Sequence, residues 1–368
     1  MAKLRVAGVG AGYFSQFHMA GWAAIEDAEL VAWCDTDATK SAAARARYSI
    51  RDAFTDVAAM LDAARPDLVD IVTPPATHHA LVGEAARRGI PVICQKALAP
   101  TYDEAVAVVE VAERAGIPLV VHENFRWQPW YREARRVIDE GRLGVLHTVA
   151  FRLRPGDGQG AAAYLDRQPY FQRMPRFLVY ETAIHLIDTF RYLVGEVVAV
   201  TARLRRMNPV IDGEDAGYII FEFAGGATGL FDGNRLNDHV AENPRRTMGE
   251  MWLEGSAGVL RLDGDAQLWW KPHQREETRL EYDPGDTVTF GGGACERLQR
   301  HVVAHLLHGG PVENLGRDYL VNLRIQEAVY ASHANGCRMA LEAAPSNAEV
   351  GIGAPSQHAA QRRASQQR

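Results

Sequence analysis

The first 121 residues alternate short apolar runs with longer amphipathic stretches, and no other feature limits the possible folds as strongly. The runs predict strands at Leu4–Val9, Glu29–Cys34, Leu68–Thr73, Pro91–Gln95 and Pro118–Val121, and the stretches predict helices near Ser15–Ile25, Ala38–Tyr48, Asp56–Ala64, Thr77–Arg88 and Tyr102–Ala115. Strands that alternate with helices at this spacing indicate a doubly wound parallel sheet with helices on both faces. Gly89 and Gly116, each followed closely by a proline, mark two helix ends.

Beyond about residue 122 strands predominate, which predicts a second, α+β domain with a large, mostly antiparallel open sheet. The expected strands are His147–Arg154, Val197–Leu204, Ala216–Ala224, Thr228–Asn234, Glu250–Leu253, Val259–Leu262 and Thr278–Tyr282, and the expected helices are Trp130–Glu140, Glu181–Val194, Glu296–His308 and Asp318–Asn335. We therefore expect domains at 1–124 and 125–342. Residues 343–368, rich in Ala, Ser, Gln and Arg, have the composition of a disordered tail.

Composition excludes several function classes. The 368 residues carry a net charge of −6 with no basic block, which argues against nucleic-acid binding. No apolar run approaches the roughly 18 residues of a membrane span. The first residues have no signal-peptide pattern, and the four cysteines stand far apart, so we expect a cytoplasmic protein without a disulfide framework or zinc ribbon.

A glycine-rich turn follows the first expected strand. Gly10, Gly12 and Ser15 fit the pattern G-x-G-x-x-G with serine in the third place, and Tyr13 and Phe14 lie within the same turn. The first glycine allows a tight turn, the second lets a pyrophosphate approach the backbone, and the helix start supplies amide donors. Because the turn joins a strand to a helix, it predicts a dinucleotide site; the alternative is a plain glycine-rich turn.

An acidic side chain ends the second expected strand. Asp35 follows Gly10 by 25 residues, the distance at which a carboxylate binds the adenosine ribose hydroxyls. Such a carboxylate repels a 2′-phosphate, so NAD is expected rather than NADP. The alternative role, capping of the next helix, suits Asp37 better.

Two further segments carry candidate catalytic groups. Lys96 follows the strand Pro91–Gln95 at the edge where ligands of parallel sheets bind, although a solvated lysine would have the same position. Glu181, His185 and Asp188 share one face of an expected helix, so the acids could brace the histidine for proton transfer. A purely structural histidine and a metal site are the alternatives. The metal site is the weaker one because no second histidine stands four residues away.

Taken together and in this order, these elements resemble the Gfo/Idh/MocA oxidoreductases from residue 4 to about 340. Further matching pieces are Thr73-Pro74 with His78, Asn124-Phe125-Arg126 with Pro129, and Ile325-Gln326-Glu327-Ala328. The resemblance implies an N-terminal Rossmann domain that binds NAD, and a C-terminal sheet that joins subunits into a homodimer or homotetramer. It also implies a sugar, cyclitol or related polyol or sugar-acid substrate.

The family's catalytic residues correspond to Lys96, Glu181 and His185. This chain has Gln95 and Ala97 where the family has Glu and Pro around the lysine, and Glu181 in place of Asp. The expected cofactor-binding residues are Gly10, Gly12, Tyr13, Phe14, Asp35, Thr73, Pro74, His78, Gln95, Lys96, Asn124 and Arg126. The expected substrate-binding residues are Lys96, Arg154, Tyr164, Tyr180, Glu181 and His185, and no metal is expected.

The sequence thus predicts an NAD-dependent dehydrogenase acting on a secondary alcohol. In this interpretation His185 takes the hydroxyl proton, Lys96 stabilises the oxyanion, and Glu181 orients His185 or a substrate hydroxyl. Transient use of NAD for isomerisation, elimination or glycoside cleavage is one alternative, and a non-catalytic nucleotide sensor is another.

A final hypothesis concerns substrate charge. The segment 151–180 contains five arginines and only two acids, and part of it is a long polar loop that leads into Tyr180. Arginine suits carboxylates and phosphates, which makes an acidic substrate a possible interpretation, with surface or interface pairing as the alternative.

Overall fold

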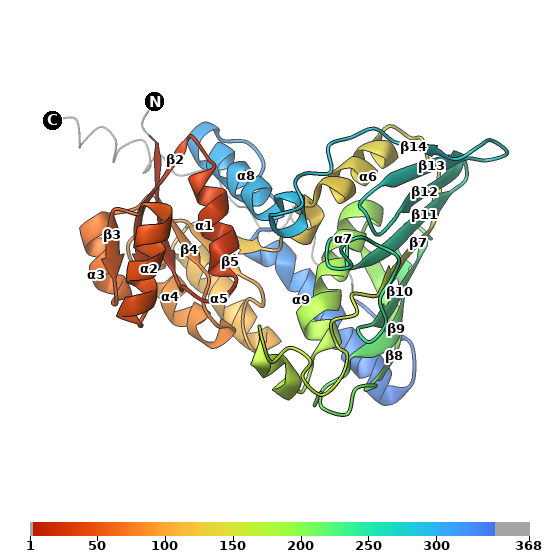
Figure 1. Ribbon diagram of the computed structural model, residues 1–368, viewed down its shortest axis with the longest axis horizontal. Coiled ribbons are helices and arrows are strands. Elements are labelled where there is room, and N and C mark those ends of the chain that lie inside the picture. Colours follow the sequence, from red (N-terminus) through yellow and green to blue (C-terminus); the bar gives the residue numbers. More distant parts are fainter. Residues whose placement is uncertain (1–2, 343–368) are drawn as a thin grey trace.

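The computed structural model describes residues 3–342, so the expected tail at 343–368 lies outside the described residues. Within residues 3–342 the strands form two sheets, of six and nine strands. Figure 1 places the sheets at opposite ends of the molecule, with α6, α7 and α9 between the larger sheet and the N-terminal domain. The predicted fold class is confirmed.

The N-terminal sheet has the strand order β3-β2-β1-β4-β5-β6, and all its pairs are parallel. Its strands are β1 (Leu4–Val9), β2 (Ala28–Cys34), β3 (Asp52–Phe54), β4 (Leu68–Ile71), β5 (Val92–Gln95) and β6 (Leu119–His122), and its helices are α1 (Ser15–Ala23), α2 (Ala38–Tyr48), α3 (Val57–Ala64), α4 (His78–Ala86) and α5 (Tyr102–Arg114), with the turn η1 (Pro75–Thr77) before α4. The sequence prediction missed β3, because three half-buried residues give no periodicity.

Helix α5 illustrates why these segments form where they do. Thr101 caps it by accepting a hydrogen bond from the Glu104 amide, and Asp103 and Glu104 place negative charge in the first turn. Buried Ala105, Val108, Val109 and Ala112 recur at helical spacing and face the core, and Gly116 with φ +66° follows the helix end. The glycine predicted at this end is therefore confirmed.

The C-terminal sheet has the order β14-β13-β12-β11-β7-β10-β9-β8-β15. Its strands are β7 (Leu146–Leu153), β8 (Val197–Arg205), β9 (Ala216–Phe223), β10 (Thr228–Asn234), β11 (Gly249–Gly255), β12 (Gly258–Leu262), β13 (Leu268–Pro272), β14 (Thr278–Arg279) and β15 (Met339–Ala340). Only the central pair β7 and β10 is parallel among these described strands. The sequence analysis missed β13 and β15 and made β14 too long. The edge strands β14 and β15 have only two residues each, which is too short for an alternating pattern.

The C-terminal helices connect the two halves. They are η2 (Phe125–Trp127), α6 (Pro129–Asp139), η3 (Pro169–Arg173), α7 (Ile184–Val194), η5 (Phe290–Gly292), α8 (Ala294–His308) and α9 (Gly316–Asn335). The chain returns to the N-terminal domain through α8, whose Leu298 and Val302 share a buried cluster with Trp22 of α1. Figure 1 shows α8 beside α1, while α9 packs on both α5 and β8.

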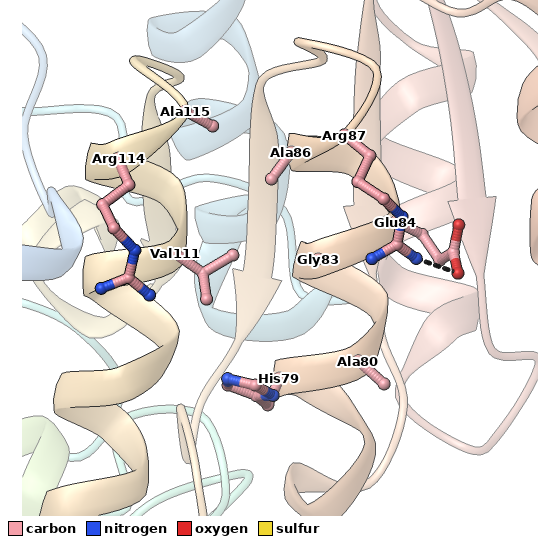
Figure 2. Close-up of a pocket in the computed structure, with 9 residues that line it drawn as sticks. All are labelled: His79, Ala80, Gly83, Glu84, Ala86, Arg87, Val111, Arg114 and Ala115. Carbon is pink, nitrogen blue, oxygen red and sulfur yellow. Dashed lines mark hydrogen bonds and ion pairs between the residues drawn. The ribbon is translucent and has the colours of Figure 1, made fainter.

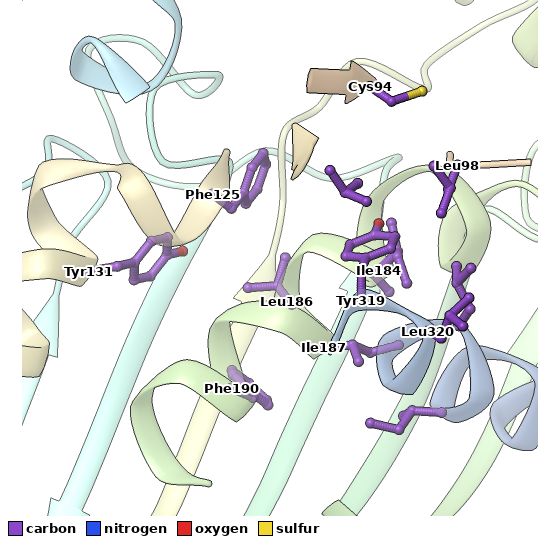
Figure 3. Close-up of a cluster of buried hydrophobic side chains, with 14 of the residues drawn as sticks. Cys94, Leu98, Phe125, Tyr131, Ile184, Leu186, Ile187, Phe190, Tyr319 and Leu320 are labelled. Atoms are coloured by element: carbon purple, nitrogen blue, oxygen red, sulfur yellow. The ribbon is translucent and has the colours of Figure 1, made fainter. Parts of the chain in front are cut away.

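The main hydrophobic core runs across both domains without interruption. One buried cluster contains Cys94 of β5, Leu98 after that strand, Ile184 of α7 and Tyr319 of α9, and Figure 3 shows Leu98 near Ile184. Because the same core holds β5, β6 and α7, the ends of those elements have fixed relative positions. Within residues 3–342, no helix combines the length and apolar character needed to cross a membrane.

The helix predicted over Glu181–Val194 begins differently from the expectation. A π-helical turn, η4 (Leu178–Ala183), precedes α7 and contains Glu181. Such turns are frequent at functional sites because they alter the direction of side chains within a helix.

Candidate active site

Lys96 reaches from the end of β5 into the other domain. Its Nζ lies 2.9 Å from Glu181 Oε1 and donates a second hydrogen bond, also 2.9 Å, to the Glu181 backbone oxygen. The lysine side chain is only 12% exposed. The alternative of a solvated lysine at a strand end is therefore wrong, and the carboxylate beside this lysine comes from the π-helical turn.

His185 is held by a carboxylate that the sequence analysis did not name. Its Nδ1 lies 2.5 Å from Oε1 of Glu123, the residue that follows β6. The expectation that Glu181 and Asp188 brace His185 is wrong. Glu181 pairs with Lys96, and Asp188 accepts bonds from Arg126 and Asn322. We call Lys96, Glu123, Glu181 and His185 the acid–base cluster.

Glu123 is fully buried, yet it is stabilised as a carboxylate. Burial by itself raises the pKa of Glu123, but the charges of His185 and Lys96 and hydrogen bonds from His185 and the Phe125 amide lower this pKa below its ordinary value. The Tyr319 hydroxyl donates to the other carboxylate oxygen over 3.3 Å. The sequence did contain a signal for Glu123, because an acid directly after a buried parallel strand lies at the ligand-binding edge.

The glycine-rich loop, residues 10–15, has the geometry that a dinucleotide needs. Gly10 has φ +97°, and a Cβ there would lie 2.5 Å from the Val72 carbonyl oxygen. A Cβ on Gly12 would meet nothing within 4 Å, which leaves open space for a pyrophosphate beside the backbone. Ser15 is buried and donates to the Gly12 carbonyl, so this small third residue fits closely at the start of α1.

Asp35 is fixed beside this loop. Its Oδ2 accepts the Ala11 amide over 2.7 Å, and its Oδ1 accepts the Asp37 amide over 2.9 Å. Each oxygen retains a lone pair for a ribose hydroxyl. Asp37 caps α2 by accepting from the Thr39 amide, as the sequence predicted.

The remaining residues expected at the cofactor divide into surface and interior positions. Tyr13 is 43% exposed on the glycine-rich loop, and Phe14 packs against Phe290. Thr73 and Pro74 form the turn after β4. His78 is fully buried and bonds the backbone oxygens of Thr73 and Leu98, so it ties the loops after β4 and β5 together, and burial lowers the pKa of this imidazole.

Three other expected cofactor residues direct their side chains into the protein. Gln95 accepts the Lys96 amide and bonds His18 Nε2 over 3.1 Å. Asn124 donates to the Cys295 sulfur over 3.7 Å. Arg126 forms two hydrogen bonds with Asp188, and this pair joins the domain crossover to α7.

The expected substrate residues outside the acid–base cluster are also engaged in internal bonds. Arg154 pairs with Asp232, and Tyr164 lies buried against Asp157 and Arg235. The Tyr180 hydroxyl donates to the Ala99 oxygen, and burial together with the Glu181 charge raises the pKa of Tyr180 to about 12.

The arginines of segment 151–180 carry little unpaired charge. Ion pairs join Arg154 to Asp232, Arg167 to Asp157, Arg173 to Asp212 and Arg176 to Glu327. Arg152 is exposed on β7. These pairs agree with the alternative interpretation, in which the arginines pair with acids of the protein. The arginines therefore lend no particular support to an acidic substrate.

The sequence analysis also missed Arg235, which follows β10 and is 2% exposed. It donates to both oxygens of Asp157 and, over 2.5 Å, to the Thr182 hydroxyl. Thr182 adjoins Glu181, so the hydrogen bond from Arg235 holds the π-helical turn that carries Glu181. Nothing in the local sequence signals this role, because it depends on a contact 53 residues away.

Two cavities lie elsewhere on the molecule. One, of about 490 Å³, lies between α4 and α5, and Figure 2 shows Arg87 with Glu84 on one side and Arg114 on the other. The second, of about 610 Å³, is lined by Arg176, Glu214 and Tyr330 among others. Neither contains a member of the acid–base cluster. Among the described residues, no group of three or more His, Cys, Asp or Glu side chains could hold a metal ion.

Comparisons with known proteins agree with this geometry. Residues 4–123 match the family model described as an oxidoreductase family with an NAD-binding Rossmann fold, and residues 131–261 match the GFO/IDH/MocA C-terminal domain. A D-apiose dehydrogenase of Paraburkholderia graminis is 36% identical over 89% of this chain and 87% of its own. A D-apiose dehydrogenase of Rhizobium rhizogenes is 31% identical over 91% and 97%.

A solved structure of similar sequence extends the agreement to three dimensions. An oxidoreductase from Agrobacterium radiobacter, crystallised with NAD+, L-tartaric acid and magnesium, is 30% identical with a TM-score of 0.84. The match covers 92% of this chain and 98% of that one. These findings confirm the predictions of an NAD cofactor and of an oxidoreductase.

Proposed function

This chain belongs to the Gfo/Idh/MocA family of NAD-binding oxidoreductases, and on that premise we propose that it oxidises a secondary or hemiacetal hydroxyl of a neutral sugar. One observation carries the proposal. Lys96 from the N-terminal domain lies beside the helical segment that carries His185, and each has its own carboxylate partner. A cation and a histidine directed at the same hydroxyl can polarise it and remove its proton.

The residues of the chain divide the work as follows. The His185 imidazole accepts the hydroxyl proton, and the Lys96 ammonium donates a hydrogen bond to the oxygen as it becomes negative. Glu181 keeps Lys96 in place by accepting two of its three N–H donors, and the third donor remains for the substrate. Gly10, Gly12, the start of α1 and Asp35 would hold NAD, which when bound supplies the hydride acceptor.

Two observations support a neutral sugar as the substrate. The relatives named D-apiose dehydrogenase are 36% and 31% identical over most of their length, and D-apiose is a neutral sugar. The arginines of segment 151–180 are largely neutralised by acids of the same chain. An acidic substrate would have to bring its charge to groups that already have partners.

The proposal extends to the assembly and the compartment. Trp252, Ala150, Leu230 and Ile220 form a cross-strand row on β11, β7, β10 and β9, and Leu230 and Ile220 remain 38% and 44% exposed. An apolar row on an open sheet fits a subunit interface, so we propose a homodimer or homotetramer through this face.

The compartment is also part of the proposal. The cysteines within residues 3–342 are free thiols, which suits a cytoplasmic protein.

The experiment is a substrate panel with purified protein and NAD or NADP. D-apiose, other neutral aldoses, cyclitols and the matching aldonic acids are compared by the absorbance of reduced nicotinamide, at low and high salt. We expect NADH to accumulate with a neutral sugar and little turnover with the acid. Turnover of a sugar without NADH accumulation would replace net oxidation by transient use of NAD. A clear preference for the acid at both salt concentrations would contradict the neutral-sugar proposal.

A further inference from the structure

The carboxylate of Glu123 is placed to control the reactivity of His185, although the two residues are 62 positions apart in the chain. Glu123 follows β6 at the carboxyl edge of the parallel sheet, while His185 lies in the first turn of α7. Their 2.5 Å contact is the direct polar link between the sheet edge and that histidine. Glu123 is 0% exposed and His185 7% exposed, so little water competes for the contact.

The contact determines which ring nitrogen is available for chemistry. A carboxylate can only accept, so Nδ1 of His185 carries the proton, and Nε2 of the neutral ring is then an acceptor. Among the described residues Nε2 has no hydrogen-bond partner, whereas Nδ1 is committed to Glu123. The free nitrogen is therefore the one that can receive a proton from a substrate hydroxyl.

Further contacts hold the pair in a single geometry. The Phe125 ring stacks on the imidazole with centroids 4.0 Å apart and planes 4° apart, so it supports one face of the imidazole. The Glu123 carboxylate is itself fixed by the Phe125 amide and the Tyr319 hydroxyl, each at 3.3 Å. The Asn314 side chain donates to the Glu123 backbone oxygen over 2.8 Å. Phe125 thus contacts both partners, through its ring and through its amide.

We propose that Glu123 is the positioning residue of His185: it fixes the Nδ1–H form and stabilises the imidazolium that forms when Nε2 takes the substrate proton. The proposal rests on the proposed dehydrogenase function and assigns to Glu123 the role that the sequence analysis gave to acids on the same helix. A buried carboxylate beside a histidine has this effect on proton transfer in other enzymes, where its loss costs several orders of magnitude in turnover.

A purely structural ion pair is the alternative, and the chain offers a matched control for it. Asp188, on the same helix as His185, is also buried and pairs with Arg126 at the same domain crossover. Glu123→Gln and Asp188→Asn each remove one buried charge and keep the side-chain shape. The other titratable groups around His185 are Lys96 after β5, His122 on β6, Glu181 in the π-helical turn and Tyr319 on α9, and both variants retain them.

The test measures kcat and kcat/KM from acid to neutral pH, and NADH affinity by fluorescence, for the wild type and both variants. For Glu123→Gln we expect kcat to fall ~10²- to 10⁴-fold with NADH affinity within about twofold, by analogy with other carboxylate–histidine pairs. The acid limb of kcat/KM should move to lower pH, because the imidazolium has lost its partner. Asp188→Asn should unfold more easily while its acid limb stays where it is in the wild type.

Equal losses in the two variants with an unmoved acid limb would overturn the proposal and leave a structural pair. A proton NMR titration of His185, assigned with His185→Asn, gives a readout without turnover. We expect its midpoint to lie at lower pH in Glu123→Gln than in the wild type, and an unchanged midpoint overturns the proposal. If the wild type binds NADH but oxidises no sugar while the midpoint still moves, the dehydrogenase proposal fails and the coupling of Glu123 to His185 stands.

Discussion

The glycine-rich loop and the acid–base cluster lie at the same edge of the N-terminal sheet, but the chain builds them in opposite ways. The loop is held by contacts of short sequence separation, such as Ala11 to Asp35 and Trp33 to the Gly10 carbonyl, 24 and 23 residues apart. The cluster is held by pairs 85 and 62 residues apart, Lys96 with Glu181 and Glu123 with His185.

This difference separates two functions of the site. The loop belongs to one βαβ unit and depends on backbone conformation, so it serves cofactor affinity. The cluster depends on how α7 packs against η2 and α9 at the domain boundary, so it serves proton transfer. If this division is correct, substitutions in the cluster should change turnover, and substitutions at the loop should change cofactor affinity and preference.

The largest effect is expected for His185→Ala. Turnover should fall ~10²- to 10⁴-fold because the variant loses the group that accepts the proton. NADH affinity should remain within about twofold, since the glycine-rich loop is untouched. Steady-state kinetics and fluorescence titration measure the two quantities, and the exposed His147→Ala is the control. Unchanged turnover would assign His185 a structural role.

Lys96→Met should have the next largest effect. Removing the cation leaves the developing oxyanion with one donor fewer, which corresponds to a ~10²- to 10³-fold loss of kcat. Glu181→Gln is the matched variant, because it keeps Lys96 and the backbone acceptor at 181. We expect it to lose less than Lys96→Met does. If Glu181→Gln is as inactive as Lys96→Met, Glu181 acts on the substrate directly.

Asp35→Ser tests the other region. We expect NAD to bind ~10- to 100-fold more weakly and the preference for NAD over NADP to decrease, because a charged acceptor for the ribose is worth about 1.5–3 kcal/mol. Saturating NAD should restore kcat. Asp37→Ser is the control, since serine also caps a helix and the Asp37 side chain accepts a hydrogen bond from the Thr39 amide of α2. A wild-type enzyme that uses NADP as well as NAD would contradict the assignment of Asp35.

The smallest expected effect is on the pH dependence of the free energy of unfolding. His122 lies on β6 against the His18 ring, with centroids 3.8 Å apart and planes tilted by 30°, and both its ring nitrogens are buried and unpartnered among the described residues. Burial, and next the His18 charge, lower the pKa of His122 well below its ordinary value. The unfolded chain therefore binds a proton that the folded chain does not, and stability is lost as the pH falls below about 6.5.

His122→Leu should remove this contribution. The slope of unfolding free energy against pH should become shallower by up to about 1.4 kcal/mol per pH unit on the acid side of about pH 6.5. Urea unfolding at several pH values measures it, with the exposed His79→Leu as control. An equal slope in wild type and His122→Leu would mean that His122 takes up its proton in the folded protein.

Much of the cofactor region could be predicted, for a physical reason. Strand periodicity, glycines and an acid at the end of the second strand are signals that lie within 35 residues, and backbone sterics give them one meaning. Even there, Gln95, Asn124 and Arg126 make internal bonds that no pattern announced. Their partners His18, Cys295 and Asp188 come from other elements.

The sequence by itself determined the two-domain α/β architecture, the dinucleotide turn at Gly10 to Ser15, and the candidacy of Lys96 and His185. Only the tertiary structure decided which carboxylate serves which base. The sequence favoured Glu181 for His185, because helical neighbours four residues apart share a face. The π-helical turn and the packing of α7 on η2, the turn after β6, instead gave Glu181 to Lys96 and Glu123 to His185. Ion pairs are decided by distances between elements, and those distances depend on how the whole core packs, which no local pattern encodes.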